Sequence, residues 1–576
     1  MNADGVRWFA TKDTRPLSVT NTDNRIIANL FRHVFAEFAA KTCSGEQRGF
    51  LLNRFLLENV VDIDFEARKL YLEDVDGCLL LVDLSAAFPS LSQSYLFEVM
   101  ARQGVPAGFQ TAVKRLYENN VQHIKLDGET SRSFTVHSGV RQGCPLSPVL
   151  FALALDPFLN LLVQRLPSGT LVRAYADDMA IALRSRISMP VVASCFDVLA
   201  GATSLHVNVT KTVYIPLYPT TELQATKDIA HTNWRSMIVS IGYGKYLGYF
   251  VGPYANADVN FEAPMRKFRE RVAYWLSMRH LGSYFQVLGF NMCALSVLSF
   301  ISQLYMLPAA MVADTRSMAL QFMLGPSEWF MGRGVHRGHA YFRAQFDLNM
   351  KASPRCPEAY TMCHMFNTIN RFMFDFMTKY YTLSRLVGIL PFQLGTKVLH
   401  DSPAASCKLV HTFMQQPGVM REFRETVPLV GPATAAYRAI FKVIHPDGSV
   451  ECLFDSRYRE RWIKKKIISS SKVVGSSTAA IANLKWLSQH VPPRVHLSNI
   501  RLHLNGWHTA ARYQQKLRCV FCSNPRAEDR LEHILVCPVI QQAMPAQLRS
   551  ASDGRVTADT LFLFGLSKPD RLLVAL

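Results

Sequence analysis

The stretch Leu171–Leu183, which reads LVRAYADDMAIAL, constrains this chain more than any other. Apolar residues alternate on both sides of a short polar tip, a pattern typical of a β-hairpin. The tip would hold the adjacent carboxylates of Asp177 and Asp178. Carboxylate oxygens suit Mg²⁺, and two bound Mg²⁺ ions can activate an attacking hydroxyl and stabilise a leaving phosphate. Most Asp-Asp pairs occur in solvated turns, so a metal site needs support from elsewhere in the chain.

A third carboxylate follows an apolar run upstream. Residues 78–82 read CLLLV, which is typical of a strand buried on both faces, and Asp83 closes the run. A carboxylate at the end of a buried strand is costly unless it is paired or bound to metal. Alternatively, Asp83 or Ser85 is the N-cap of the next helix, and the two roles are compatible.

The charge balance indicates a polyanionic partner. Lys and Arg outnumber Asp and Glu by 63 to 44, with nucleic acid the first expectation and an anionic membrane surface the second. Hydrophobic residues make up 49% of the chain and charged ones 19%, which excludes a disordered chain. Residues 262–280 predict an amphipathic helix whose basic face carries Arg266, Lys267 and Arg269. That face either tracks phosphates or is simply solvated.

Two further features bear on the compartment. Residues 281–313 carry no charge, but Gln286, Asn291 and several serines interrupt them, so a buried helix pair is expected rather than a membrane span. Most of the twelve cysteines are scattered singly, which suits a reducing intracellular compartment.

A metal-ligand pattern lies near the end of the chain. Its spacing is Cys519-x2-Cys522-x10-His533-x3-Cys537, which suits tetrahedral Zn²⁺. Flanking arginines and lysines keep the segment basic. The alternative is two free cysteines beside a core histidine.

Taken together, the ordered stretches resemble the reverse transcriptase of non-LTR (LINE-type) retrotransposons. They run RPLS, QRGF, LVDLSAAF, SGVRQGCPLSP, AYADDM, VNVTKT and KYLG, between Arg15 and Gly248. The resemblance extends over roughly 15–308, and the Cys/His segment matches the zinc knuckle that follows many such enzymes. No single motif decides this; the ordered set is specific.

The resemblance implies an RNA-directed DNA polymerase with an α+β, right-hand architecture. Asp83 and Asp177 would hold two Mg²⁺ ions (Mn²⁺ is possible), with the Leu84 carbonyl completing one shell and Asp178 completing the acidic pair. Lys211 would give a proton to the leaving pyrophosphate. The implied nucleotide-binding residues are Arg15 from the fingers, Phe88 as a gate against the ribose 2′-hydroxyl, Gln142 and Gly143. Template RNA, primer or target DNA and dNTPs are the implied partners, with no membrane.

The implied domain plan has six parts. They are partial fingers at 1–75, a palm with an antiparallel sheet and inserted fingers elements at 76–253, a helical thumb at 254–313, a helical connector at 314–500, the zinc knuckle at 501–545 and a tail at 546–576. Fourteen residues precede Arg15 and 39 follow Cys537, too few for either endonuclease type of such elements. A polymerase core from a truncated element copy is therefore expected.

Two other interpretations stay open. The chain could be a catalytically weak, nucleic-acid-binding remnant of such an element, although the intact acidic and glutamine positions argue against decay. It could also be a maturase or telomerase-like relative; the GVRQGCPLSP stretch and the terminal knuckle favour the LINE type. The expected location is the nucleus or cytoplasm, within a ribonucleoprotein.

Overall fold

The computed structural model describes residues 20–126, 129–322, 355–389, 392–415, 442–444, 450–452 and 477–493, with scattered positions from 495 to 543. Arg15 lies outside them. Contacts divide the chain into two compact units, one of residues 1–259 with 374–405 and the other of 260–373 with 406–576.

The first unit mixes helices with a sheet, as the predicted α+β class requires. Its helices are α1 (Thr22–Thr42), α2 (Leu56–Leu72), α3 (Ala87–Ser90), α4 (Gln93–Arg102), α5 (Ala107–Tyr117), α6 (Ser147–Arg165), α7 (Met189–Thr203), α8 (Glu222–Ile229), α14 (Phe392–His400) and the second half of α13 (Pro357–Leu386). Its principal strands are β1 (Cys78–Val82), β6 (Leu171–Tyr175), β7 (Asp178–Leu183), β8 (Val213–Pro216) and β9 (Ile238–Val239).

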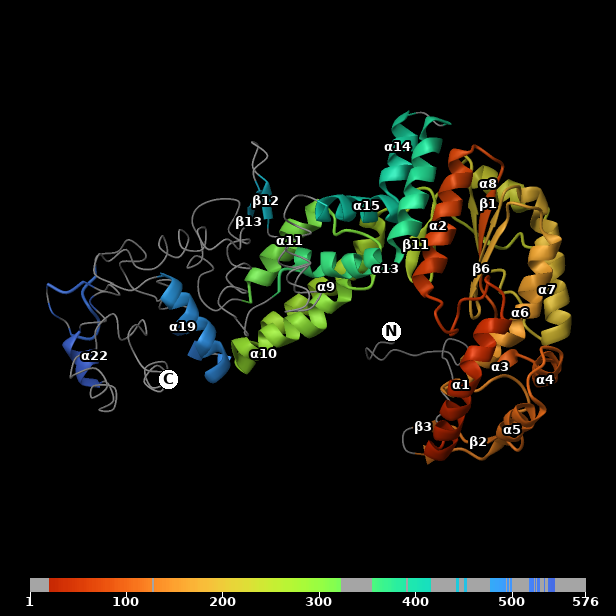
Figure 1. Ribbon diagram of the computed structural model, residues 1–576, viewed down its shortest axis with the longest axis horizontal. Helices are drawn as coiled ribbons and strands as arrows, with labels where there is room; N and C mark the ends of the chain where they lie inside the picture. Colours follow the sequence, from red (N-terminus) through yellow and green to blue (C-terminus); the bar gives the residue numbers. More distant parts are fainter. Residues whose placement is uncertain are drawn as a thin grey trace, which may run out of the picture. The chain divides into compact units, whose positions relative to one another are not determined.

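These strands form one five-stranded sheet in the order β6-β7-β1-β8-β9. Every pairing is antiparallel except that of β8 with β9. All five residues of β1 are buried, which confirms the prediction of a strand covered on both faces. Cys78, Leu80 and Val82 pack into the core that contains α6 and α7, because alternate side chains of a strand face opposite sides. Figure 1 shows α2 on the other face of the sheet.

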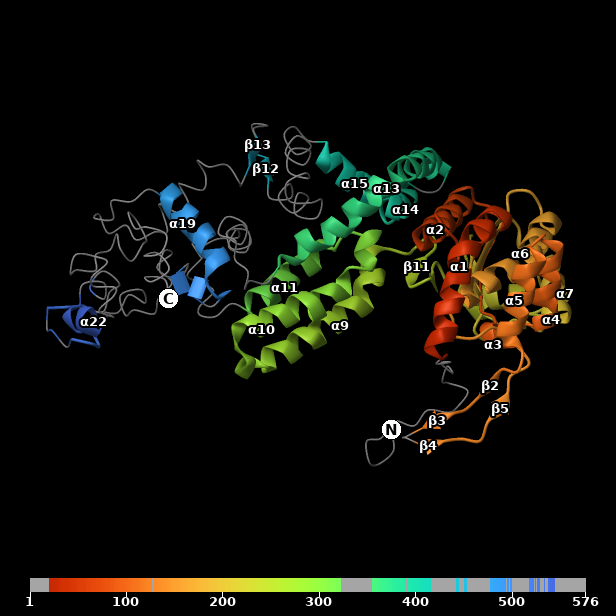
Figure 2. The same ribbon diagram turned by 60° about the horizontal axis from the view of Figure 1, so that its bottom comes forward.

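A two-part ribbon extends from α5. It consists of β2 (Val121–Gln122) paired with β5 (Phe134–Thr135) and β3 (Lys125–Leu126) paired with β4 (Glu129–Thr130), all antiparallel (Figure 2). The sequence predicts this hairpin from its alternation around Asp127-Gly128, and these two residues themselves lie outside the described part. A smaller hairpin pairs β10 (Gly244–Tyr246) with β11 (Tyr249–Val251), shortly before residue 259, where the first of the unit's two chain segments ends.

A late segment of the chain completes the first unit. Leu383, Val398 and Leu399 pack with Tyr71 and Leu72 at the end of α2. Although the sequence places 374–405 in a connector of unknown role, contacts group this segment with residues 1–259. The helix α13 departs from helical geometry at Phe372, next to the boundary between the two units.

The second unit is largely helical where it is described. Its elements are α9 (Ala257–Ser277, which starts in the first unit), α10 (Gly282–Gly289), the π-helical turn η4 (Phe290–Ala294), the 3₁₀ turns η5 (Leu295–Leu298) and η6 (Ile301–Gln303), α11 (Ala309–Leu320), the rest of α13, most of α15 (Pro403–Met414), β12 (Lys442–Ile444), β13 (Val450–Cys452), α19 (Ser477–His490) and α22 (Pro538–Ala543). In α9, Phe268 and Val272 are buried while Arg266, Lys267 and Arg269 are exposed, which confirms the predicted amphipathic helix.

Two segments bear on the membrane question. Residues 281–313 do not form the expected buried helix pair: regular α-helix extends only over Gly282–Gly289, short π and 3₁₀ turns follow it, and α11 begins at Ala309 and buries only Thr315 and Ala319. Among the described residues, α6 alone is long and apolar enough to cross a membrane, and 67% of its apolar window is buried inside the molecule. A buried core helix meets the same criterion.

Candidate active site

The predicted hairpin is present, and its turn is tight. β6 and β7 pair antiparallel from Leu171↔Ala182 to Tyr175↔Asp178, so Ala176 and Asp177 form a two-residue turn. Ala176 adopts the left-handed region at φ 55°, which such turns require and which non-glycine residues rarely enter. Asp177 is half-buried and Asp178 is exposed. The turn therefore presents both carboxylates at one end of the sheet.

The strand register brings Asp83 to the same end. Val82 of β1 pairs with Met179 of β7, so Asp83 lies at the next position, opposite Asp178. Its backbone is anchored on both sides, because its N–H donates to Thr212 Oγ1 at 3.3 Å and its carbonyl accepts from the Asn208 N–H at 2.8 Å. The N-cap alternative for Asp83 and Ser85 is wrong. The residue before α3 is Ala86, in the left-handed region, and that helix has no side-chain cap.

Two further predicted residues are connected to Asp83: Lys211 through backbone hydrogen bonds of Asn208, and Leu84 as the next residue in the chain. Lys211 is exposed in the turn that leads into β8, and its N–H donates to the Asn208 carbonyl at 3.0 Å. Since Asn208 is also bonded to Asp83, the turn that carries Lys211 is tied to the acidic strand end. Leu84 is 6% exposed and forms an isolated bridge with Val207.

Three of the predicted nucleotide-binding residues lie on two segments joined by a backbone hydrogen bond, Phe88 in α3 and Gln142 and Gly143 in a loop before α6. The Phe88 ring is half-buried and stacks on the Phe151 ring of α6, with centroids 4.7 Å apart. The Val140 N–H donates to the Phe88 carbonyl at 2.7 Å, which leaves Gln142 and Gly143 two and three residues further along. Gly143 has φ 96°, where a side chain would be strained.

The strand register brings Asp83, Asp177 and Asp178 to the same end of the sheet. Among the described residues, however, their oxygen atoms do not form a group close enough to share one ion. The group of His, Cys, Asp or Glu side chains close enough to share one ion is the Cys/His set described below. Half-buried and exposed carboxylates at the ends of adjacent strands are nevertheless oxygen donors of the kind that hydrated Mg²⁺ accepts. The donor set thus fits the implied metal.

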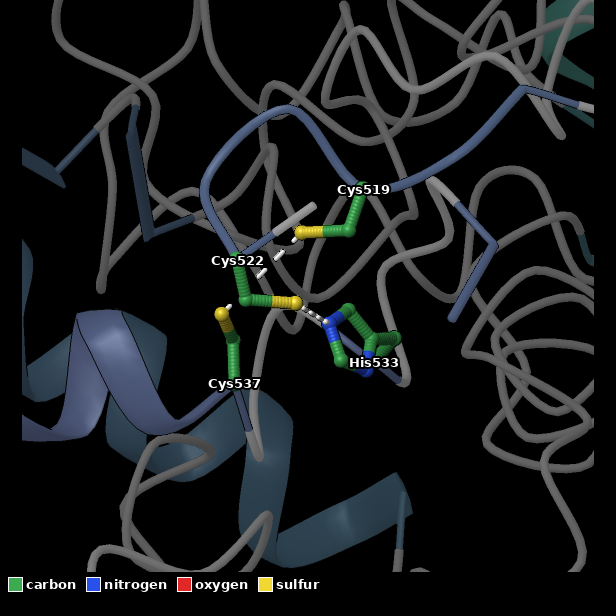
Figure 3. A group of neighbouring side chains, drawn as sticks. All are labelled: Cys519, Cys522, His533 and Cys537. Carbon is green, nitrogen blue, oxygen red and sulfur yellow. Dashed lines mark hydrogen bonds between the residues drawn. The ribbon is translucent and has the colours of Figure 1, made fainter. Parts of the chain in front are cut away.

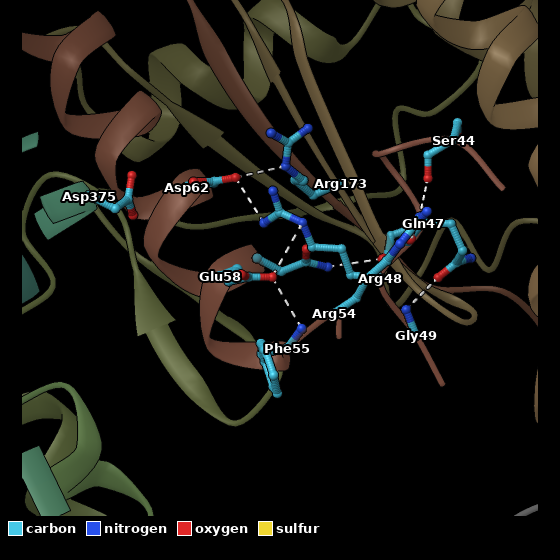
Figure 4. Close-up of polar contacts among 12 residues, drawn as sticks. Ser44, Gln47, Arg48, Gly49, Arg54, Phe55, Glu58, Asp62, Arg173 and Asp375 are labelled. Atoms are coloured by element: carbon cyan, nitrogen blue, oxygen red, sulfur yellow. Dashed lines mark hydrogen bonds and ion pairs between the residues drawn. The ribbon is translucent and has the colours of Figure 1, made fainter. Parts of the chain in front are cut away.

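A charged cluster, which sequence reasoning missed, links α2 to β6, the first strand of the hairpin. Asp62 of α2 contacts Arg48 Nη1 and Arg173 Nε, each at 2.9 Å, and Lys379 Nζ at 3.2 Å (Figure 4 shows Asp62 with the two arginines). Burial raises the pKa of Asp62, but the three cations more than offset it and hold that pKa below its usual value. No local pattern identifies this cluster, because its members come from four separate segments.

The Cys/His segment forms a convergent cluster (Figure 3). The ligand atoms of Cys519, Cys522, His533 and Cys537 all lie within 4.8 Å of one another. Cys519 Sγ and Cys537 Sγ are 4.0 Å apart, near the roughly 3.8 Å expected between two thiolates on tetrahedral zinc. Burial raises the pKa of Cys519, but the backbone N–H groups of Cys522 and Phe521 bring it below its usual value. The backbone N–H of Asn524 lowers the pKa of Cys522, but burial and the neighbouring thiols raise it above its usual value. These residues fit zinc.

Comparison with known proteins places the hairpin in a family context. Residues 4–249 match the family model of the reverse transcriptase (RNA-dependent DNA polymerase). The Pol polyprotein of the type-2 retrotransposable element R2DM of Drosophila melanogaster is 30% identical over 191 residues, which are 31% of this chain and 17% of that protein. The transposon TX1 149 kDa protein of Xenopus laevis is 27% identical over 258 residues, 42% of this chain and 19% of that protein.

The matches span less than a fifth of the length of these two relatives. Among solved structures, apo telomerase from Candida tropicalis is similar with a TM-score of 0.31 and 10% identity, over 72% of this chain and 60% of that one.

Proposed function

Because residues 4–249 form a reverse transcriptase domain of the non-LTR retrotransposon type, we propose that this chain copies RNA into DNA. The reaction is transfer of a nucleotidyl group from a dNTP to a primer 3′-hydroxyl. The observation that carries the proposal is the register of β1, β6 and β7, which puts Asp83 beside the Asp177-Asp178 turn within the matched segment.

Each residue then has a defined task. Two Mg²⁺ ions held by Asp83 and Asp177 would supply charge stabilisation for the attacking oxygen and the leaving phosphates. Asp178 would add negative charge beside them, and the Leu84 carbonyl would provide an oxygen ligand. Exposed Lys211 donates a proton to the leaving pyrophosphate. Gln142, Gly143 and Phe88 line the incoming nucleotide, and Arg15 contacts it.

The wider proposal follows the right-hand plan, with the sheet as the palm and α9 in the thumb. The exposed Arg266 and Lys267 of α9 suit the phosphates of a template–primer duplex. Template RNA and primer or target DNA are the proposed partners, and the proposed setting is a ribonucleoprotein in the nucleus or cytoplasm.

Primer extension tests the function directly. Purified protein, an RNA template, a DNA primer, dNTPs and Mg²⁺ should give extended primer, and the double variant Asp177→Ala/Asp178→Ala should give none while it still binds RNA. Full extension by the double variant would contradict the assignment. Tight, salt-sensitive RNA binding without extension by the parent protein would instead support the catalytically weak remnant.

Substitution of Phe88 should weaken sugar discrimination. In Phe88→Val the ring no longer fills the space of a 2′-hydroxyl, so we expect the kcat/KM ratio of dNTP to rNTP to fall at least tenfold, mainly through faster rNTP incorporation. Single-nucleotide incorporation measures the ratio. Phe151→Leu, which removes only the stacked neighbour, is the control and should change it less; an unchanged ratio in Phe88→Val contradicts the gate.

We also propose that the Cys/His cluster binds one Zn²⁺ and stabilises residues 519–537. Chelation or Cys522→Ser should release one zinc per chain, detected by elemental analysis, and should expose this segment to protease because metal binding and folding are coupled in small modules. The control is Cys195→Ser, at a buried position in α7 outside the cluster, and this variant should retain one zinc per chain. A stoichiometry near zero in the freshly purified protein would refute the site.

A further inference from the structure

A buried amide lies beneath the Asp177-Asp178 turn. The Gln47 side chain is 0% exposed. Its Oε1 accepts hydrogen bonds from the Ala176 N–H at 2.9 Å and from the Gly49 N–H at 2.8 Å, and its Nε2 donates to the Ala176 carbonyl at 3.3 Å (Figure 4 shows Gln47 and Gly49). One side chain thus binds both polar backbone groups of the turn residue Ala176.

The partners fix the orientation of this amide. Two of them are backbone N–H donors and the third is a carbonyl acceptor, so only the observed placement of Oε1 and Nε2 satisfies all three. A buried amide without partners costs free energy, so this geometry is strongly preferred over a rotated one.

The turn needs external support. Ala176 holds the left-handed region without the advantage of glycine, and its methyl group offers no hydrogen bond of its own. The Ala176 carbonyl belongs to the same peptide group as the Asp177 N–H. The bond from Gln47 Nε2 to that carbonyl therefore restrains the peptide plane from which Asp177 begins.

The segment around Gln47 is itself tightly fixed to the hairpin. The Arg48 N–H donates to the Ala174 carbonyl at 2.9 Å, and the Ala174 N–H donates to the Glu46 carbonyl at 2.8 Å. At Gly49, a Cβ would lie 2.2 Å from the Ala176 nitrogen, so only glycine permits this backbone approach. These contacts therefore fix the position of Gln47 relative to the turn.

We propose that Gln47 is a positioning residue, which sets the orientation of the Asp177 carboxylate for the divalent metal through the Ala176 peptide. This inference rests on the proposed function and assigns to that site a residue that does not touch metal or substrate. It explains how a turn of ordinary residues can hold a carboxylate rigidly enough for Mg²⁺, which demands near-ideal octahedral ligand geometry.

Two substitutions separate positioning from general stability. Gln47→Met fills the space but removes all three bonds. We expect the Mg²⁺ concentration for half-maximal extension to rise roughly tenfold or more, because loss of a group that orients a metal ligand typically costs about 10–100-fold in metal affinity. Gln47→Glu has the same shape, and its neutral carboxyl can make all three bonds, whereas its ionised form cannot donate. Its extension rate relative to the parent should rise as the pH falls from about 8.5 to about 6, because burial raises the pKa of a carboxyl.

The control is Gln224→Met, which removes an exposed glutamine of α8 bonded to Asp228 and should leave both profiles unchanged. An unshifted Mg²⁺ requirement in Gln47→Met, or a flat pH ratio in Gln47→Glu, overturns the proposal. If Gln47→Met does not fold, the pH ratio of Gln47→Glu decides alone. If the parent protein itself does not extend primers, the proposed function fails separately. Mn²⁺ binding, followed by electron paramagnetic resonance on the parent, Gln47→Met and Asp177→Ala, then decides this inference, with weaker binding in both variants expected.

Discussion

Replacing Asp83 by asparagine should abolish primer extension, with a loss on the order of 10³-fold or more. Asparagine keeps the size of the side chain and one oxygen, but it removes the negative charge that a divalent ion needs at the end of β1. Because the backbone of Asp83 is bonded to Thr212 and Asn208, the fold at this strand end should persist. Steady-state extension on an RNA template measures the loss.

The stability of the same variant provides a second readout. Asp83, Asp177 and Asp178 bring three negative charges to one end of the sheet, and without metal these charges repel one another. Asp83→Asn should therefore unfold in urea, in the absence of metal, at the same or a slightly higher midpoint than the parent. Asp197→Asn, at an exposed position of α7, is the matched control and should retain both extension and midpoint. Extension by Asp83→Asn within threefold of the parent would contradict the role of Asp83.

The parts of the site that sequence alone could predict are those written in local patterns. Alternation predicts the β6–β7 hairpin, a continuous apolar run predicts β1, and the spacing of Cys519 to Cys537 predicts a cluster that the structure brings together. Each depends on residues that are neighbours in the chain. The meeting of Asp83 with Asp178 depends instead on the pairing of distant strands, and only the resemblance to a family implied it.

The supporting residues are invisible to such patterns. Gln47 lies 129 residues from Ala176, and nothing in its immediate sequence marks it as buried beneath a turn. Likewise, the 374–405 segment reads as one more helical stretch, yet it packs on α2 through contacts about 330 residues apart. Such contacts arise from tertiary packing, which overrides local propensity. The sequence also assigned a capping alternative to Asp83 that the left-handed Ala86 rules out, because the chain turns before α3 begins.

The late segment leads to the second large prediction, which concerns Arg68. This guanidinium is 0% exposed and pairs with Asp64 at 2.7 Å within α2. It also donates to the carbonyls of Ala255 at 2.6 Å, Val398 at 2.8 Å and Pro253 at 3.2 Å. One side chain therefore joins three segments of the first unit. It donates to a fourth carbonyl, that of Asp401, at 3.4 Å. Truncating Arg68 removes the donor of these four carbonyls and leaves the buried Asp64 carboxylate without its cation; among the described residues, only the Gly252 N–H still donates to it, at 3.1 Å.

We expect Arg68→Met to lower the free energy of unfolding of the first unit by about 3–5 kcal/mol, the usual cost of breaking a buried ion pair by removing one partner. Urea denaturation of the full chain, followed by a probe in the first unit, measures it. The chain offers a matched control in Arg102, which pairs with Glu98 at the same i,i+4 spacing and the same 2.7 Å, but with side chains 79% and 60% exposed.

Arg102→Met should change stability by no more than about 0.5 kcal/mol, because water screens an exposed pair. The two variants thus share residue type, spacing and distance, and they differ in burial and in the backbone carbonyls that only Arg68 contacts. In addition, Arg68→Met should make residues 374–405 more accessible to protease or hydrogen exchange, since the bond to the Val398 carbonyl is lost. Equal effects of the two substitutions would mean that the late segment is held to α2 by its apolar contacts alone, through Leu383, Val398 and Leu399, and that the buried arginine contributes little.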